Sequence, residues 1–352
     1  MNRRKRYTVA CLSGDGIGPE LMAEASRALA EAGRLHGFRV EEVHAPFAGE
    51  AVTRHGHPLP AATRSACRRA DAVLVALTKE PALEGVKAEL DLTWRVQRVR
   101  LPDGDLAIVS PLDDQVEPFV VRRAFDLARS RRARLTAVGE GMAWNTFVNW
   151  EAERHPGVEV ERLTATQALP ELMNAPARFC VVVTQRQHGE LVSDLAAAGR
   201  EESPIVASGR LSATGPGIFG PTHGSAPDIA GQGVANPSGM LLAAALMLSE
   251  GLGERTAGRT LERAVSSTLA AGVRTPDVAG VGPAATTRDF MDTVLDLMPT
   301  TRTDVEFIAG ETAGFPRVPP LPARRASAAA GGRARNAARG GGTQRATSEV
   351  AT

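Results

Sequence analysis

Lysine and tyrosine are nearly absent from this sequence of 352 residues, although arginine is abundant. Of its 41 basic residues, 38 are arginine, and the three lysines are Lys5, Lys79 and Lys87. Tyr7 is the one tyrosine. The chain beyond Lys87 therefore cannot supply a lysine amine or a tyrosine phenol for proton transfer, which limits the catalytic chemistry open to it.

Cysteine and long apolar runs are scarce as well. Cys11, Cys67 and Cys180 each lie in or beside an apolar segment without metal-binding spacing, so we expect buried, reduced thiols. No apolar run reaches the roughly 18 residues of a membrane helix, and the start MNRRKRYTV lacks an apolar signal core. The formal net charge of +1 implies no special attraction to nucleic acid. These features predict a cytoplasmic protein without a membrane partner.

What the chain does have is an alternation of strand-like and helix-like segments, which predicts an α/β fold. Near the N-terminus, YTVACLS, FRVEEVHA and ADAVLVAL read as strands, and Pro19 opens an amphipathic helix. From about Leu101 the pattern restarts with the strand DLAIVS, a helix over 117–131, the strands RLTAV, VEVERL and RFCVVVT, and a helix from His188. Three further helices are predicted over 240–248, 261–269 and 290–297.

The most informative stretch is the loop HGSAPDIAGQGVANP, which spans residues 223–237. Its small residues allow a flat ligand to approach the backbone, and Asp228 could accept hydrogen bonds from a ribose diol. The carboxylate of Asp228 would also repel a ribose 2′-phosphate. The alternative interpretation is a glycine-rich surface loop in which Asn236 caps a helix that starts at Pro237.

This loop resembles the NAD-binding loop of the isopropylmalate and isocitrate dehydrogenase family of β-decarboxylating dehydrogenases. CLSGDGIGPELMAEA at 11–25 resembles the first strand, glycine turn and helix of the same family. Other motifs follow in the expected order, so that the resemblance covers roughly residues 6–310; they are HGHPLP at 55–60, ADAVLVAL at 70–77, HGELVSD at 188–194 and RTPDVAG at 274–280.

The resemblance implies a two-domain isopropylmalate-dehydrogenase-like α/β fold with a discontinuous first domain. We expect a cofactor-binding domain over 1–98 and 203–316, and an inserted α/β domain over 99–202. The remaining segment, 317–352, is rich in arginine, glycine and alanine and has few apolar groups, so we expect it to be disordered.

The resemblance also implies NAD as the cofactor and Mg²⁺ or Mn²⁺ as the metal. Glu190 and Asp194 match two metal-binding carboxylates of the family and lie four residues apart on a predicted helix, so both project from one face. A third family aspartate aligns with Thr166. A solvated acidic helix face is the alternative. The implied NAD contacts are His223, Gly224, Ser225, Ala226, Asp228, Ile229 and Asn236.

The substrate clamps of the family are changed. Its members hold substrate carboxylates with arginines, but the aligned positions here are Lys87, Gln97 and Ser110. Arg95 and Arg98 lie close by in the sequence, with Arg100, and would be either displaced clamps or ordinary surface arginines.

The proton-transfer residues are changed more severely. Glu140 stands at the position of the family lysine, and the chain passes from Leu112 almost directly into a helix, without the tyrosine-bearing loop or the β-arm that clasps a second subunit. Glu140 in a partly dry cleft could act as a base, and His188 as an acid near the metal. Alternatively, each residue only begins the helix that follows it.

Two functions remain open from the sequence. The first is an NAD-dependent oxidoreductase of altered catalytic residues, acting on a small 2-hydroxy acid or related hydroxy or keto acid. The second is a catalytically silent NAD-binding or regulatory relative. In either case we expect a homodimer, because the helix around Glu190 and Leu191 could still pair with a second copy.

Overall fold

The computed structural model describes residues 4–77, 81–101, 104–114, 117–197, 205–212, 215–278 and 284–311. The chain divides into two compact units, Met1–Leu321 and Pro322–Thr352. All described residues belong to the first unit. The segment 317–352, predicted to be disordered, lies outside the described residues.

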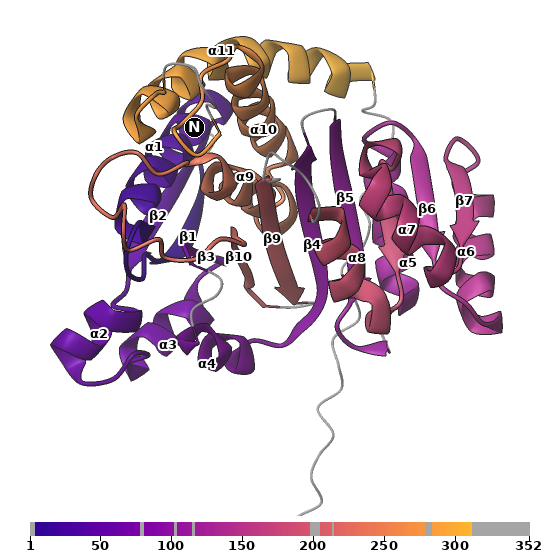
Figure 1. Cartoon of the computed structure of the whole chain (residues 1–352), viewed down its shortest axis with the longest axis horizontal. Helices are drawn as coiled ribbons and strands as arrows, with labels where there is room; N and C mark the ends of the chain where they lie inside the picture. Colours follow the sequence, from indigo (N-terminus) through magenta and orange to yellow (C-terminus); the bar gives the residue numbers. More distant parts are fainter. Residues whose placement is uncertain are drawn as a thin grey trace, which may run out of the picture. The chain divides into compact units, whose positions relative to one another are not determined.

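One mixed sheet of ten strands forms the centre of the first unit (Figure 1). Its strand order is β2-β1-β3-β10-β9-β4-β5-β8-β6-β7. The strands are β1 (Lys5–Leu12), β2 (Phe38–His44), β3 (Ala72–Val75), β4 (Leu92–Leu101), β5 (Gly104–Pro111), β6 (Arg134–Val138), β7 (Glu159–Leu163), β8 (Val181–Thr184), β9 (Ile205–Ser212) and β10 (Gly217–Pro221).

The strand order shows that the chain leaves the first half of the sheet and later returns to it. β10 pairs in parallel with β3, although more than 130 residues separate them in sequence. Between these strands the chain builds β5, β8, β6 and β7, which are mutually parallel where they pair. The antiparallel strands β4 and β9 join the two parallel halves. This discontinuous α/β topology confirms the predicted fold class, whereas the predicted domain boundaries stay predictions.

Helices cover both faces of the sheet. The helices are α1 (Gly18–His36), α2 (Ala48–His55), α3 (Ala61–Arg69), α4 (Ala82–Glu89), α5 (Glu117–Arg129), α6 (Met142–Arg154), α7 (Ala165–Asn174), α8 (Gly189–Ala197), α9 (Ser238–Leu246), α10 (Arg255–Ala270) and α11 (Thr287–Glu311). α1, α9, α10 and α11 pack together, and α9 lies directly on β9 and β10. α5 packs on α6, and α7 packs on α8.

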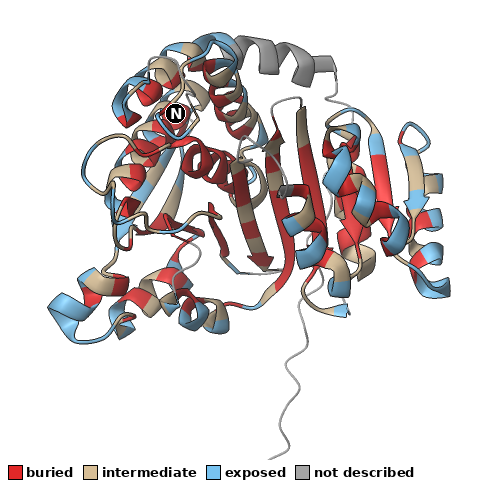
Figure 2. Ribbon diagram, in the orientation of Figure 1, coloured by how far each residue is buried: buried red, intermediate tan, exposed pale blue. Residues whose placement is uncertain are grey.

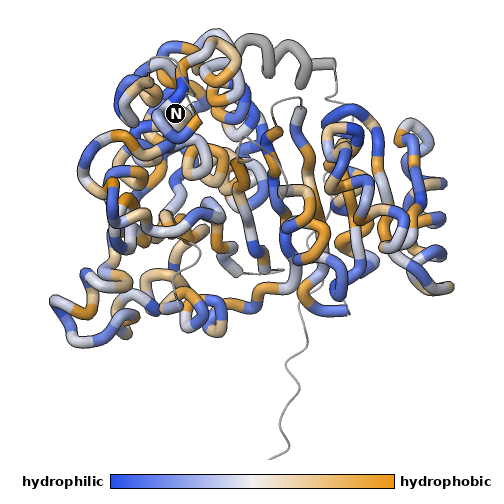
Figure 3. Tube along the Cα trace, in the orientation of Figure 1, coloured by the Kyte–Doolittle hydropathy of each residue, from blue (hydrophilic) through white to orange (hydrophobic). Residues whose placement is uncertain are grey.

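The core follows the strands and the central helix α9, all of whose residues are buried. Figure 2 shows this burial in red along the middle strands, and Figure 3 shows the hydrophobic residues along the same strands. Such burial removes apolar surface from water, the main favourable contribution to folding. Among the described residues, no helix combines the length and the apolar character that crossing a membrane requires.

The predicted strands and helices are present, but several helices are longer than the apolar pattern indicated. α10 begins at Arg255 and α11 at Thr287, because their first turns are polar and carry no hydrophobic signal. α5 ends at Arg129, two residues before the predicted end, and the turn that follows includes Ala133 with a positive φ of 53°. The three cysteines are buried free thiols, as predicted. Burial raises the pKa of Cys11 to about 12 and that of Cys67 to about 11.

The single tyrosine provides a test of this packing. The Tyr7 hydroxyl donates a 2.6 Å hydrogen bond to Glu254 at the start of α10. Burial, and then Glu254, raise the pKa of Tyr7. The stability that this neutral phenol contributes is therefore complete below the ordinary tyrosine pKa of about 10 and is lost as pH rises through the raised value.

An absorbance titration of tyrosinate should consequently report Tyr7 alone, with a midpoint above about 10. We expect Glu254→Gln to lower this midpoint, because the substitution removes a negative charge beside the phenol. A midpoint at or below the ordinary value, or one that Glu254→Gln leaves unchanged, would contradict the described contact.

Candidate functional site

The glycine turn after β1 touches the loop 223–237 directly. Ile17 donates its backbone N–H to the carbonyl oxygen of Ser225 at 2.9 Å. Gly16 has a positive φ of 59°, and a Cβ there would lie 1.9 Å from the same carbonyl oxygen. Only glycine fits this approach. Two sequence motifs separated by about 200 residues therefore form one structural feature.

The position of this feature is the usual one for a ligand site in an α/β sheet. The turn follows the carboxyl end of β1, and the loop follows the carboxyl end of β10. Both strands pair in parallel with β3, which lies between them. The carboxyl ends of parallel strands meet at one edge of a sheet, where α/β proteins commonly bind their ligands.

Several hydrogen bonds hold the loop in place. Thr287, at the start of α11, donates its backbone N–H to Gly233 at 2.8 Å and its hydroxyl to Ala235 at 2.6 Å. The side-chain amide of Gln232 donates to the Asp228 carbonyl oxygen at 2.7 Å. The Asp228 side chain itself is exposed. Among the contacts of the described residues, none engages its carboxylate, which leaves it accessible to a ligand.

The side-chain amide of Asn236 already makes hydrogen bonds to protein groups through both its oxygen and its nitrogen. Its Oδ1 accepts the backbone N–H of Ser238 at 2.9 Å, at the start of α9, which agrees with the helix-capping alternative. Its Nδ2 donates to Asp277 at 3.2 Å. Asp277 belongs to the RTPDVAG motif, so this amide ties that motif to the loop.

The other loop residues assigned to NAD are spread along its length. His223, Ser225, Ala226 and Ile229 are partly buried, and Gly224 is exposed. Ala226 takes a positive φ of 36° and packs on the main core together with Ile229. The loop is thus anchored on one side and open on the other.

A second cluster surrounds Arg95 on β4. Arg95 is paired across the sheet with Arg210 on β9 and Ser110 on β5. Oε1 of Glu190, on α8, lies 3.5 Å from the Arg95 guanidinium and 3.7 Å from that of Arg210. Burial, and then Arg210, lower the pKa of Arg95. Two guanidiniums close to one carboxylate make this cluster suited to an additional anion.

Small residues bring the first turn of α8 onto this cluster. A Cβ on Gly189 would lie 2.7 Å from Ser110 Oγ and 3.0 Å from the Arg95 guanidinium. Ser193, one turn later, donates its hydroxyl to Gln97 on the same strand as Arg95. Gln97 and Ser110, which the resemblance aligns with clamping arginines of the family, therefore pack here against α8.

Glu140 and His188 lie on neighbouring loops. They follow β6 and β8, which are parallel and adjacent. Gln185 connects the loops. Its side-chain amide makes two hydrogen bonds with the Glu140 backbone, at 3.0 and 3.1 Å. Its backbone carbonyl oxygen accepts the backbone N–H of His188 at 3.1 Å. The Glu140 side chain is exposed. Glu140 borders an open hollow, and the partly dry cleft proposed for it from the sequence stays a prediction.

Arg98 and Lys87 do not join the Arg95 cluster. Side chains alternate along a strand, so Arg98 projects from the opposite face to Arg95. Its guanidinium lies 3.6 Å from Glu262 on α10, which covers that face. The Lys87 amine pairs with Glu84 of its own helix at 2.6 Å. Arg98 and Lys87 therefore lie apart from the Arg95 cluster, and their assignment to substrate binding stays a prediction.

Glu190 and Asp194, the two carboxylates predicted to bind the metal, lie in surroundings that suit a divalent cation poorly. Asp194 is exposed on α8, but Glu190 is already directed to two guanidiniums. Thr166 stands in the first turn of α7, where its hydroxyl contacts Thr164 at 2.9 Å. Two carboxylates without a third, beside two positive charges, fit a divalent cation poorly. In the part of the chain that the structure describes, the one group of three close potential ligands is elsewhere, formed by Cys11, Glu42 and His44.

Sequence reasoning missed two residues of these sites. Arg210 completes the Arg95 pair, and Gln185 connects the Glu140 and His188 loops. Neither has a local signal, because each acts through a partner about 45 or more residues away. Pairing of the arginine-bearing strands would have been the signal for Arg210.

The sequence of this chain is similar to those of a known family of dehydrogenases. A sequence model described as Isocitrate/isopropylmalate dehydrogenase matches residues 8–96 and 112–294, which is more than half of the chain. The chain belongs to this family. It is 32% identical to a 3-isopropylmalate dehydrogenase of Synechococcus sp. (strain CC9902), over 79% of this chain and 95% of the relative. It is 30% identical to one of Aquifex aeolicus (strain VF5), over 83% and 97%.

Solved structures of the family show the same fold. An isocitrate dehydrogenase from Methylococcus capsulatus superposes with a TM-score of 0.66 at 25% identity, covering 83% of this chain and 99% of that one. A beta-decarboxylating dehydrogenase from Thermococcus kodakarensis gives 0.66 at 26% identity, covering 89% and 100%. The family match leaves out residues 97–111, which contain the end of β4 and all of β5.

The contact between the glycine turn and the loop can be tested by adding one methyl group. Gly16→Ala should destabilise the protein by about 3 kcal/mol or more, because a positive φ costs about 1 kcal/mol and the methyl also collides with Ser225. Gly37→Ala is the matched control, since Gly37 has a φ of 80° and a methyl group there would meet nothing within 4 Å. It should cost only about 1 kcal/mol.

Denaturant unfolding of both variants measures the difference. Equal losses of stability would show that the turn and the loop are not in contact as described.

Proposed function

We propose that this chain is an NAD-dependent oxidoreductase that acts on a small 2-hydroxy acid or related compound, with catalytic residues altered from the family pattern. The observation that carries the proposal is the contact of the β1–α1 turn with the loop 223–237. It brings together two motifs of an oxidoreductase family at the ligand-binding edge of the sheet. A bound nicotinamide nucleotide would supply the hydride acceptor.

Asp228 supports the choice of NAD over NADP. Its exposed carboxylate, on a loop fixed by Gln232 and Thr287, could accept hydrogen bonds from the two hydroxyls of an unmodified ribose. A 2′-phosphate at the same place would bring two negative groups together. His223 to Ile229 and Asn236 would line the remainder of the nucleotide.

Arg95 and Arg210 are the groups that we assign to a substrate carboxylate. Guanidiniums bind carboxylates through two parallel hydrogen bonds, and the Nε of Arg95 is buried without a hydrogen-bond partner. Glu190 would then balance the second positive charge. This arrangement suits a substrate with fewer carboxylates than a clamp of three arginines would bind.

Glu140 and His188 are the groups that we assign to proton transfer. Both stand beyond the carboxyl ends of the adjacent parallel strands β6 and β8. β8 in turn pairs with β5, whose end carries Ser110 beside Arg95. Glu140 also borders a hollow of about 460 Å³ together with the polar side chains of Asn145 and Gln167. An exposed carboxylate is a weak base unless a substrate or a second subunit excludes water from it.

The replacement of the family lysine and tyrosine favours a second candidate, a catalytically silent relative that binds NAD. Glu140 would reverse the charge at the lysine position, and its side chain is exposed. The two candidates differ in one observable, because only the first forms NADH from NAD and a hydroxy acid.

Calorimetric titration with NAD and NADP, with and without Mg²⁺, tests the nucleotide site. We expect NAD to bind and NADP to bind much more weakly, and Asp228→Ala to weaken NAD binding at least about tenfold, as for loss of a charged hydrogen-bond partner. Asp296→Ala, which removes the same charge from an exposed position on α11, should leave binding unchanged. If neither nucleotide binds the intact protein, the oxidoreductase proposal fails.

The Mg²⁺ arm tests the metal residues in the same experiment. Glu190 and Asp194 stay the proposed ligands of Mg²⁺ or Mn²⁺, although this chain alone offers an incomplete set. We expect no heat from Mg²⁺ in the absence of nucleotide and substrate. Binding that both Glu190→Gln and Asp194→Asn abolish would show that the ion displaces the arginines.

We also propose a homodimer, formed through the outer face of α7 and α8. Met173 on α7 and Leu191 on α8 are large apolar side chains that are each nearly half exposed, at 46%. A second copy would cover them and could exclude water from the neighbouring carboxylates. The buried reduced thiols suit the cytoplasm as the compartment of this dimer.

Sedimentation analysis of the intact protein and of Leu191→Glu tests this surface. We expect a dimer that the substitution converts to a monomer, while Val52→Glu, at an apolar side chain of 47% exposure on α2, leaves it a dimer. A monomeric intact protein would rule the dimer out.

A further inference from the structure

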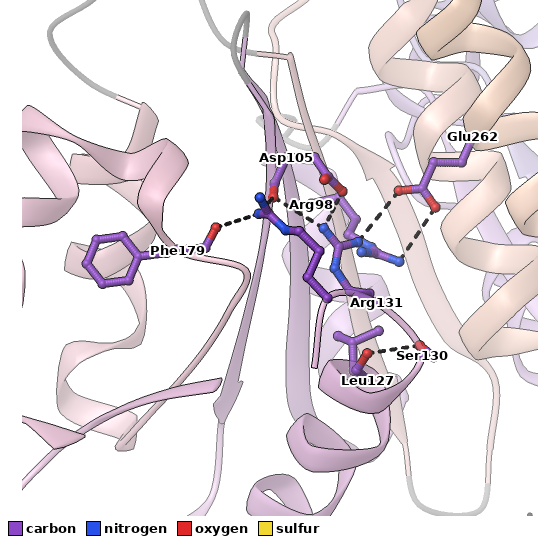
Figure 4. Close-up of polar contacts among 8 residues, drawn as sticks. Arg98, Asp105, Leu127, Ser130, Arg131, Phe179 and Glu262 are labelled. Atoms are coloured by element: carbon purple, nitrogen blue, oxygen red, sulfur yellow. Dashed lines mark hydrogen bonds and ion pairs between the residues drawn. The ribbon is translucent and has the colours of Figure 1, made fainter. Parts of the chain in front are cut away.

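A cavity of about 550 Å³ lies on the face of β4 opposite to the Arg95 cluster. Arg98 and Arg100 enter it from β4, and Asp105 from the start of β5. Ser130 to Arg132 contribute from the turn after α5, and Arg259, Glu262, Arg263 and Ser266 from α10. Figure 4 shows how several of these side chains converge between the strands and α10. The volume is in the range of small-molecule sites.

The charge of this cavity is strongly unbalanced. Two carboxylates line it, Asp105 and Glu262, against six guanidiniums, so four positive charges are uncompensated. The six arginines are Arg98, Arg100, Arg131, Arg132, Arg259 and Arg263. Like charges brought together repel one another, and an arrangement of this kind is stabilised when an anion binds among them.

Part of the network has a plain structural role. Arg131 binds Asp105 through its side chain, and Arg132 donates to the carbonyl oxygens of Asp105 and Phe179 at 3.2 and 2.8 Å. Glu262 lies 3.6 Å from the Arg98 guanidinium and 3.9 Å from that of Arg131. These contacts join α5 and β5 to α10, and they occupy both carboxylates of the cavity.

In the described part of the chain, several guanidinium nitrogens that line the cavity lack a hydrogen-bond or ion-pair partner. Nη1 of Arg98 and Nε of Arg131 are buried without a hydrogen-bond partner. Among the described residues, Arg100, Arg259 and Arg263 have no carboxylate within ion-pair distance. Burial, followed by the neighbouring arginines, lowers the pKa of Arg259. A structural salt-bridge network does not need these additional positive charges around an open space.

We propose that this cavity binds a small molecule that carries at least two phosphate groups. Each phosphate has a charge of about −1.5 to −2 at pH 7 and three acceptor oxygens, so two groups match four uncompensated guanidiniums. Planar guanidinium forks suit phosphate oxygens, whereas the two carboxylates already present are engaged by Arg98 and Arg131. The strand segment that supplies Arg98, Arg100 and Asp105 lies within residues 97–111, which the family match leaves out.

The test is calorimetric titration of the full-length protein with pyrophosphate at constant ionic strength, with inorganic phosphate and citrate as separate ligands. We expect pyrophosphate to bind more tightly than either. Arg259→Gln should weaken pyrophosphate binding about tenfold or more, the loss expected for one charged hydrogen-bond partner. Arg39→Gln, the same change at an exposed position on β2, should leave the affinity unchanged.

Two further comparisons secure the assignment. Arg263→Gln, at the exposed rim of the cavity, should also weaken binding and serves if Arg259→Gln fails to fold. Saturating NAD and the Asp228→Ala variant should leave pyrophosphate binding unchanged, which separates this cavity from the proposed nucleotide site.

The proposal is overturned if pyrophosphate does not bind, or if Arg259→Gln and Arg39→Gln bind it equally. Displacement by NAD would place the pyrophosphate in the loop site instead. Citrate binding as tight as that of pyrophosphate would overturn the assignment to phosphate.

Discussion

The approach of Gly16 to the carbonyl oxygen of Ser225 is the constraint on which the proposed cofactor site depends. No side chain fits between the two backbones, so the turn after β1 and the loop after β10 hold each other at a fixed distance. The loop in turn receives Thr287 from α11 and binds Asp277 through Asn236. Four separate stretches of sequence thereby converge on one edge of the sheet.

Strand β4 divides the remaining chemistry between two faces. Arg95 meets α8 and Glu190 on one face, whereas Arg98 meets α10 and Glu262 on the other. Because β4 pairs with the antiparallel β9, Arg210 comes to lie beside Arg95 without being near it in sequence. One arginine-rich strand thus contributes both to the small cluster that we propose for a substrate anion and to a larger cavity on the opposite face.

The chain has no lysine after Lys87 and no tyrosine after Tyr7, the two residue types that the resemblance assigns to proton transfer in the family. Glu140, which the resemblance aligns with that lysine, has an exposed carboxylate, and Gln185 binds its backbone. By the same resemblance, the motifs of the proposed cofactor site are present, whereas the residues assigned to proton transfer differ from the family pattern. An enzyme of altered chemistry and a silent NAD-binding relative both follow from this imbalance, and the formation of NADH separates them.

Local signals explain what the sequence could predict. The small residues of the turn and loop, and the apolar strands, identified the fold and the candidate cofactor residues, because each pattern is contained in one segment. The partners of individual side chains could not be predicted from such local patterns. The pairing of Glu190 with Arg210, and the separation of Arg98 from Arg95, depend on strand pairing and on which helix covers each face. The arginine cavity also went unpredicted, because its residues come from three distant segments.

Hydrogen–deuterium exchange with and without NAD tests the central claim most directly, because it locates the bound nucleotide along the chain. The account predicts that NAD protects the backbone of residues 13–18 together with that of 223–237, since the turn and the loop form one site. Protection of the β4–α10 cavity instead, or of neither segment, would contradict it.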